Sequence, residues 1–112
     1  MYKIKIYSEK NGKEPFTDWI EKLPKTDRAK IKTRLDRIKL GNFGDCKNLG
    51  DGISELRFNF SSGFRIYFTI IDNVIVLLLN GGNKSLQNKD IEKAKIYKQN
   101  CIKNRRNQYK KL

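Results

Sequence analysis

The sequence of 112 residues contains no histidine, only two cysteines and two prolines, and few acidic residues. Without histidine, and with Cys46 and Cys101 outside any CxxC spacing, a zinc site and a serine–histidine hydrolase triad are both disfavoured. The longest uninterrupted apolar run, Val74 to Leu79, is far shorter than the roughly 20 residues that span a bilayer. The first residues include no long apolar segment. We therefore expect no signal peptide and no membrane partner, and a cytoplasmic protein with reduced thiols.

The balance of charge is strongly positive. The chain has 25 Lys and Arg against 12 Asp and Glu, a formal net charge of +13, and residues 93–112 contain no acid at all. A field of this sign attracts polyanions or acidic partner segments. A genome of biased base composition also produces lysine-rich proteins, so the number of lysines is weak evidence for a polyanionic partner. The placement of the few arginines is more informative.

The spacing of the apolar residues predicts a single α+β domain with one modest core. In chain order we expect a strand at 2–7, an αα-hairpin of two helices between Pro15 and Gly41, strands at 53–60, 64–70 and 74–80, and a last helix from about Asn88. The first helix is expected to run from Pro15 to Pro24.

Several local features refine this prediction. Thr26 is expected to cap the second helix, whose buried stripe is Ile31, Leu35 and Ile38. The glycine-rich segment 42–52 is expected to be a loop, and Gly81-Gly82 to end the last strand. In the last helix, Ile91, Ala94 and Ile102 are expected to point inward, whereas Cys46 and Cys101 lie in polar surroundings.

Two arginines and a tyrosine share one side of the predicted hairpin. Arg57, Arg65 and Tyr67 alternate with core residues, so they are expected on the side of the sheet away from the core. Two guanidinium groups can neutralise a phosphoryl transition state, and a tyrosine can stack on a base or orient a 2′-hydroxyl. Lys84, beyond the last strand, adds a point charge. The alternative from the pattern alone is a solvated sheet face on which Glu55 pairs with one arginine.

Three segments in this order resemble the RelE/ParE superfamily of toxin–antitoxin toxins, most closely the HigB-like addiction module killer branch. They are Gly50–Arg57, Gly63–Phe68 and Leu77–Lys84, followed by Gln87, Asp90-Ile91 and Ala94. The resemblance implies a β-α-α-β-β-β-α fold: an antiparallel-dominated four-stranded sheet with an N-terminal αα-hairpin and a C-terminal helix. This RelE-like domain is expected over 1–102, and 103–112 is expected to be a basic C-terminal tail.

For function, the resemblance implies a metal-independent, cofactor-free mRNA endoribonuclease that acts at the ribosome and is held inactive by an antitoxin of the helix-turn-helix type. Arg65 is similar to the arginine that binds the scissile phosphate, and Arg57 and Lys84 to the basic residues that flank it. Tyr67 completes the predicted catalytic set. Predicted RNA contacts are Lys47, Arg34, Arg37 and Gln87.

Some points stay open at the level of sequence. RelE carries a tyrosine just after the position that matches Lys84, whereas this chain has Gln87 nearby, so the proton-transfer group is undetermined. A ParE-like toxin that inhibits gyrase without catalysis, and a plain RNA-binding module that uses the basic second helix, are the alternatives. Because Arg65 is expected to face away from the core, Arg65→Ala is expected to abolish toxicity without unfolding the protein.

Overall fold

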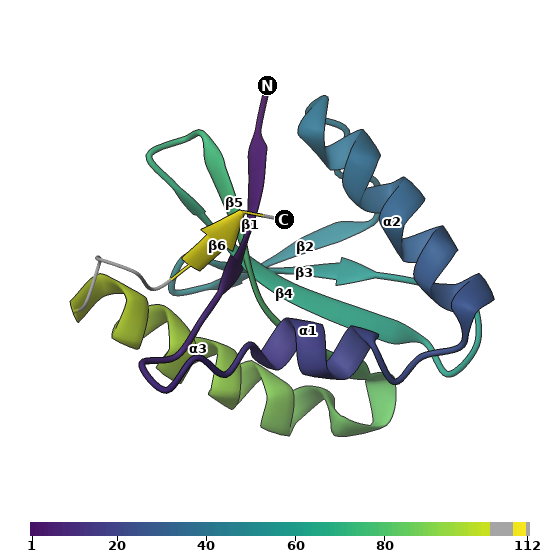
Figure 1. The fold of residues 1–112 in the computed structure, drawn as a ribbon. Helices are drawn as coiled ribbons and strands as arrows, with labels where there is room; N and C mark the ends of the chain where they lie inside the picture. Colours follow the sequence, from purple (N-terminus) through teal and green to yellow (C-terminus); the bar gives the residue numbers. More distant parts are fainter. Residues whose placement is uncertain (104–108, 112) are drawn as a thin grey trace.

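A computed structural model describes residues 1–103 and 109–111 and shows an α+β fold built on one sheet (Figure 1). The elements in chain order are β1 (Lys3–Tyr7), α1 (Pro15–Ile20), α2 (Lys25–Lys39), β2 (Cys46–Gly50), β3 (Ile53–Arg57), β4 (Phe64–Ile71), β5 (Ile75–Asn83), the 3₁₀ turn η1 (Lys84–Leu86), α3 (Gln87–Lys103) and β6 (Tyr109–Lys111). The sheet order is β2-β3-β4-β5-β1-β6. Among the described strands, the β1–β5 pair alone is parallel, so the sheet is mixed.

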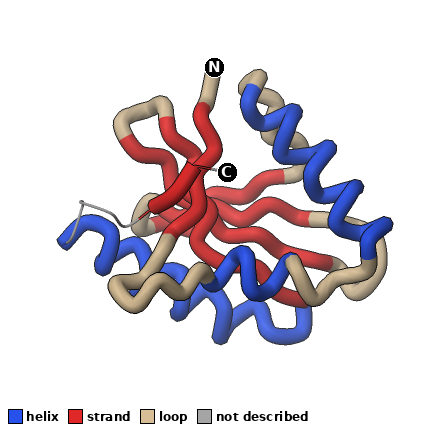
Figure 2. The backbone as a smooth tube through the Cα atoms, in the orientation of Figure 1, coloured by secondary structure: helices blue, strands red, loops and turns tan. Residues whose placement is uncertain are grey.

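The first face of the sheet is covered by α1 and α2, whose apolar sides pack on it (Figure 2). The predicted stripe of α2 is confirmed: Ile31, Leu35 and Ile38 are all buried. They join a core of Ile4, Ile6, Phe16, Leu56, Phe58, Phe64, Ile66, Phe68, Val76 and Leu78. Gly41 adopts φ +90° and its N–H donates to the carbonyl of Ile38, so this glycine ends α2 as expected.

The second face is covered by α3, which creates a second apolar cluster. Its buried members are Tyr7, Ile53, Tyr67, Leu77, Leu79, Ala94 and Cys101. A strand buried on both sides has apolar residues at successive positions, and Ile75–Leu79 of β5 show this pattern because helices lie on both faces. Ala94 points inward as predicted. The predictions for the end of the helix are wrong, because Cys101 is buried and Ile102 is 58% exposed.

Two glycines of β5 let the helices approach closely on opposite faces. The strand does not end at Gly81-Gly82 but continues to Asn83. A side chain at Gly81 would overlap the Trp19 ring of α1, and one at Gly82 would overlap the Asp90 carboxylate of α3. These glycines therefore serve packing, since even a Cβ atom has no room at either position.

Three further predictions about the elements are corrected. The segment predicted to be a loop contains β2, an edge strand with mostly exposed side chains, so neither of its faces shows an apolar pattern. Of the predicted tail, Lys103 ends α3 and Tyr109–Lys111 form β6, which pairs with β1; residues 104–108 and 112 lie outside the described residues. α1 ends at Ile20, and α2 begins at Lys25 after Pro24, so Thr26 lies inside the helix and does not cap it.

With β2 and β6, the described sheet has six strands instead of the expected four. Within the part of the chain that the structure describes, no helix is both long and apolar enough to cross a membrane.

Candidate functional site

The register of β3 and β4 brings three of the four predicted catalytic residues to one side of the sheet. Arg57 lies opposite Arg65, and Glu55 lies opposite Tyr67. On the neighbouring strand, Lys47 lies opposite Glu55. Residues directly opposite one another in a ladder point to the same face. The prediction that Arg57, Arg65 and Tyr67 share a face is therefore confirmed.

Glu55 connects these residues. Its side chain is 0% exposed, and its Oε1 accepts a hydrogen bond of 3.0 Å from Arg57 Nε. The same oxygen forms an ion pair with Arg65 Nε at 4.0 Å, while Oε2 accepts from Gln87 Nε2 at 2.6 Å. One carboxylate thus ties β3 and β4 to the first residue of α3.

Arg65 is a buried residue of this network. It is 8% exposed, and its Nη1 donates to the backbone carbonyls of Phe64, Gly63 and Phe58 at 3.0, 3.3 and 3.5 Å. Arg65 faces away from the first core as predicted, but this side of the sheet is not open to solvent, because α3 packs on it. Arg65→Ala would remove a brace of the β3–β4 turn together with a charge, so it does not separate activity from folding.

Tyr67 lies deeper still. Its side chain is fully buried, and its hydroxyl makes no hydrogen bond of normal geometry with any described residue. Burial, together with the nearby carboxylates of Glu55 and Asp90, raises the pKa of Tyr67, so the phenol stays protonated at neutral pH. The predicted stacking of this ring on a base is wrong in this structure, since the second core surrounds the ring.

Replacing Tyr67 by phenylalanine separates packing from chemistry. We expect Tyr67→Phe to change the free energy of unfolding by less than about 1 kcal/mol, because the lost hydroxyl makes no hydrogen bond of normal geometry with the residues that the structure describes. We also expect undiminished toxicity. Urea unfolding and growth arrest at matched expression measure the two effects. Loss of toxicity with unchanged stability would restore the tyrosine to the catalytic set.

The accessible part of the site is basic. Arg57 keeps 33% of its side chain exposed, and Lys47 and Lys84 are exposed. The N–H of Lys84 donates to the Gly63 carbonyl at 2.9 Å, which fixes it beside the β3–β4 turn. A Cβ at Gly63 would lie 3.5 Å from Lys84 Cβ and 3.8 Å from Arg65 Nη1, so both residues border this turn. We call Lys47, Arg57, Arg65 and Lys84 the basic cluster.

Two predicted RNA contacts lie on α2, which packs on the other face of the sheet. Arg34 donates to the carbonyls of Arg57 (2.6 Å), Asp45 (2.7 Å) and Phe43 (3.2 Å), and its guanidinium lies 4.7 Å above the Phe58 ring. Burial lowers its pKa. These contacts hold the loop before β2, so Arg34 has a structural role, and its contact with RNA stays a prediction. Arg37 is exposed and stays a predicted contact.

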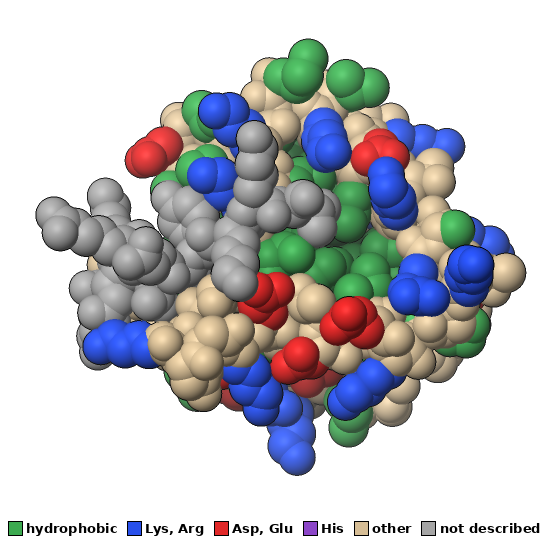
Figure 3. Space-filling view, viewed as in Figure 1, with side chains coloured by type: hydrophobic (Ala, Val, Ile, Leu, Met, Phe, Trp, Pro, Cys, Tyr) green, Lys and Arg blue, Asp and Glu red, His purple; other side chains and the backbone are tan. Residues whose placement is uncertain are grey.

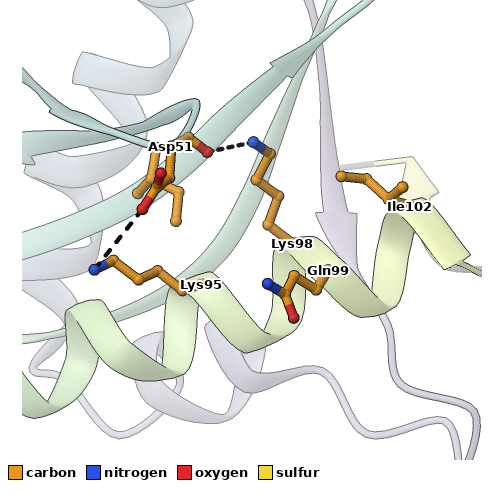
Figure 4. Close-up of a pocket in the computed structure, with 6 residues that line it drawn as sticks. Asp51, Lys95, Lys98, Gln99 and Ile102 are labelled. Carbon is orange, nitrogen blue, oxygen red and sulfur yellow. Dashed lines mark hydrogen bonds and ion pairs between the residues drawn. The ribbon is translucent and has the colours of Figure 1, made fainter.

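The lysines of α3 are also partly engaged. Figure 4 shows a pocket of about 340 Å³ between α3 and the β2–β3 turn. There, Lys98 Nζ donates to the Asp51 carbonyl, and Lys95 Nζ lies 3.9 Å from the Asp51 carboxylate. These contacts hold the turn against the helix, so both lysines have a structural role in addition to their charge.

Sequence reasoning underestimated Glu55. It entered only as a partner for one arginine, whereas it contacts Arg57, Arg65 and Gln87. The sequence did indicate its importance, because Glu55 lies between Ile53 and Leu56, two core residues of one strand. Arg57 shares its face of that strand, and Arg65 lies on the adjacent strand. Such a carboxylate needs cationic or hydrogen-bonding partners if it is buried.

Comparison with known proteins places this arrangement in a family. The family described as Phage derived protein Gp49-like matches residues 18–106, which include the whole basic cluster. The chain belongs to the Gp49-like family. This is a family of addiction module killers from toxin–antitoxin systems, and membership implies an antitoxin partner. An uncharacterized protein of Haemophilus influenzae is 46% identical over 85 residues, which cover 75% of this chain and 86% of that protein.

Proposed function

We propose that this Gp49-like protein is an mRNA endoribonuclease of the RelE/HigB type that acts at the ribosome in the cytoplasm and is neutralised by a helix-turn-helix antitoxin. The observation that supports the proposal is the basic cluster. It presents Arg57, Lys47 and Lys84 at one end of a rigid sheet, with Arg65 fixed behind them by Glu55 and backbone carbonyls. Fixed cations of this kind stabilise negative charge that develops on a phosphoryl group.

In the proposed reaction, the exposed guanidinium of Arg57 and the ammonium of Lys84 bind the non-bridging oxygens of one phosphodiester. The 2′-oxygen attacks phosphorus as the bond to the 5′-oxygen breaks, and the proton lost by the 2′-hydroxyl is balanced by one gained at the leaving oxygen. The products are a 2′,3′-cyclic phosphate and a 5′-hydroxyl. Alignment and charge neutralisation supply much of the acceleration without histidine.

A non-enzymatic toxin that binds a protein target is the second candidate. It is favoured by the ion pair between Arg57 and Glu55, because an arginine already paired within the chain has less charge to offer a phosphate. The two candidates differ in what they do to RNA, so they are separated by direct assay of the purified protein.

The deciding experiment incubates the purified protein with ribosomes programmed with a defined mRNA and maps the new RNA ends. Cleavage that leaves 2′,3′-cyclic phosphates is expected. Intact mRNA, in a preparation that still arrests growth when expressed, would overturn the nuclease proposal. Inhibition of DNA supercoiling by gyrase in parallel would establish the ParE-like alternative, and RNA binding without cleavage would indicate a binding module.

Cleavage is expected to survive EDTA. Within the described residues, no group of three or more His, Cys, Asp or Glu side chains is placed to hold a metal ion, and the proposed chemistry uses Arg and Lys in place of a metal. Ribosomes need magnesium, so the measurement uses programmed ribosomes with magnesium in excess over EDTA, which still removes zinc and manganese because it binds them more tightly. Activity that disappears with EDTA and returns specifically with zinc or manganese would contradict this expectation.

A further inference from the structure

One side of α3 connects the basic cluster to a pocket at the other end of the helix. Gln87, Lys95 and Ile102 lie on this side at helical spacing. Gln87 donates to Glu55 beneath the basic cluster, whereas Lys95 and Ile102 line the pocket beside the β2–β3 turn that Figure 4 shows. The same helix face therefore borders both the candidate phosphate site and a second, concave site.

The strands beside α3 connect the same two places. On β3, Ile53, Glu55 and Arg57 share the face on which α3 packs, because alternate residues of a strand point to one side. Arg57 belongs to the basic cluster and Ile53 lines the pocket. Between them, the exposed Lys47 of the edge strand β2 lies opposite Glu55. The chain from Arg57 back to Asp51 covers at most about 20 Å, so several nucleotides of a single strand would span the two sites.

The side chains of the pocket match the parts of a nucleotide. The volume of about 340 Å³ is within the range usual for small-ligand sites. Ile102 is 58% exposed, so its aliphatic side chain offers an apolar surface to the face of a base. Gln99 is also exposed, and its carboxamide has both donors and an acceptor for the edge of a base. Lys95 and Lys98 supply ammonium groups for a phosphate.

The acids near the pocket leave these ammonium groups able to bind. Lys95 Nζ lies 3.9 Å from the Asp51 carboxylate and 3.5 Å from that of Glu92, and the two acidic side chains are 75% and 72% exposed. Exposed pairs of this kind contribute only about 0–1 kcal/mol, so a phosphate can replace them. Lys98 donates one of the three hydrogens of its ammonium group to the Asp51 carbonyl.

Positive charge alone does not distinguish this pocket. Figure 3 shows Lys and Arg side chains over α2, on the other face of the sheet, as well. There, Arg34 donates to backbone carbonyls, and Asp36 pairs with lysines on either side of it. The α3 pocket differs because it lies on the face of the basic cluster and combines its lysines with the exposed amide of Gln99.

We propose that the pocket between α3 and the β2–β3 turn binds one nucleotide of the RNA, several positions away from the phosphate at the basic cluster. The base lies against Ile102 and bonds to Gln99, its phosphate contacts Lys95, and the intervening strand passes Lys47. The inference rests on the proposed function, because it gives the RNA substrate a second point of contact. Two linked contacts fix the register of the strand and make affinity depend on RNA length.

The test measures binding of the full chain to 2′-O-methyl RNA, which lacks the attacking hydroxyl and cannot be cleaved. An RNA of about eight nucleotides reaches both sites, whereas one of about three does not. Gln99→Glu keeps the size of the side chain but adds a negative charge. It should weaken binding of the longer RNA about tenfold and leave binding of the shorter RNA unchanged. Asn42→Asp, an exposed position outside the pocket with the same change of charge, should leave both unchanged.

A second pair of variants tests the phosphate contact. Lys95→Ala should weaken binding of the longer RNA and reduce the slope of log K against log salt concentration by about 1. Lys93→Ala, exposed on the same helix but outside the pocket, should leave that slope unchanged. Thermal unfolding confirms that each variant is folded. If Gln99→Glu and Lys95→Ala bind the longer RNA as tightly as the unchanged chain does, the proposal is wrong.

Two further comparisons complete the test. If a mixture of the four ribonucleoside 5′-monophosphates binds the unchanged chain more tightly than the longer RNA does, and Gln99→Glu abolishes that binding, the pocket belongs to a free nucleotide and the proposal is overturned. Because the binding assay uses RNA that cannot be cleaved, failure of the nuclease proposal would leave its result intact. Conversely, cleavage on ribosomes together with unaltered RNA binding by both pocket variants would remove the pocket and keep the nuclease.

Discussion

Replacing Glu55 by alanine is expected to lower the free energy of unfolding by about 3–5 kcal/mol, the usual effect of breaking a buried ion pair from one side. Glu55 is fully buried and contacts Arg57, Arg65 and Gln87. Arg65 is itself buried, so without Glu55 its charge would have no carboxylate counterpart in this network. Urea unfolding monitored by the fluorescence of Trp19 measures the change.

Two variants control this result. Glu92→Ala removes an exposed carboxylate that pairs with Lys95 at 3.5 Å, and it should change stability by no more than about 1 kcal/mol. The double variant Glu55→Leu/Arg65→Leu removes both buried charges and should recover part of the loss, because neither charge is then left alone. If Glu55→Ala unfolds at the same urea concentration as Glu92→Ala, Glu55 does not organise the site.

The second large effect concerns activity. Arg57→Ala is expected to reduce RNA cleavage by about 10²–10³-fold, the range seen when one donor to a transition-state charge is removed. The Arg57 side chain is 33% exposed and its Nε donates to the Glu55 carboxylate, which keeps contacts with Arg65 and Gln87, so the protein should stay folded. Single-turnover cleavage at saturating protein separates the rate of chemistry from RNA affinity.

Arg57→Lys separates the effect of the charge from that of the guanidinium shape. It keeps the charge but loses the planar fork that binds two phosphate oxygens, so its rate should lie between those of the unchanged chain and Arg57→Ala. Lys22→Ala, an exposed residue outside the basic cluster, should stay within about threefold of the unchanged rate. If Arg57→Ala is folded and cleaves RNA as fast as Lys22→Ala does, the basic cluster is not the phosphate site.

The alternation of residues predicted which side chains share a face but not what covers that face. Leu56 and Ile66 identified the first core, and Arg57 and Arg65 were correctly placed on the opposite side. Strand period alone does not show whether that side is open to solvent or covered by another element. In the structure, α3 covers that side. The sequence indicated such a cover in β5, because apolar residues at successive positions need an apolar layer on both faces.

Other differences have equally local causes. β2 is an edge strand whose exposed residues include Gly50 and Asn48, so its pairing with β3 leaves no apolar period to detect. Gly81 and Gly82 look like a strand end in the sequence, since glycine is usually unfavourable in strands; only the positions of Trp19 and Asp90 show why they lie inside one. Contacts between residues distant in sequence therefore determine both the β2 strand and the continuation of β5 through its two glycines.

The place of β1 in the sheet affects the order in which the chain acquires structure during synthesis. β1 is synthesised long before its partners, since Lys3 pairs with Ile75 and Lys5 with Lys111. Pairings between such distant segments form slowly because long loops must close first. The nascent killer protein therefore cannot complete its sheet until Lys111 has left the ribosome.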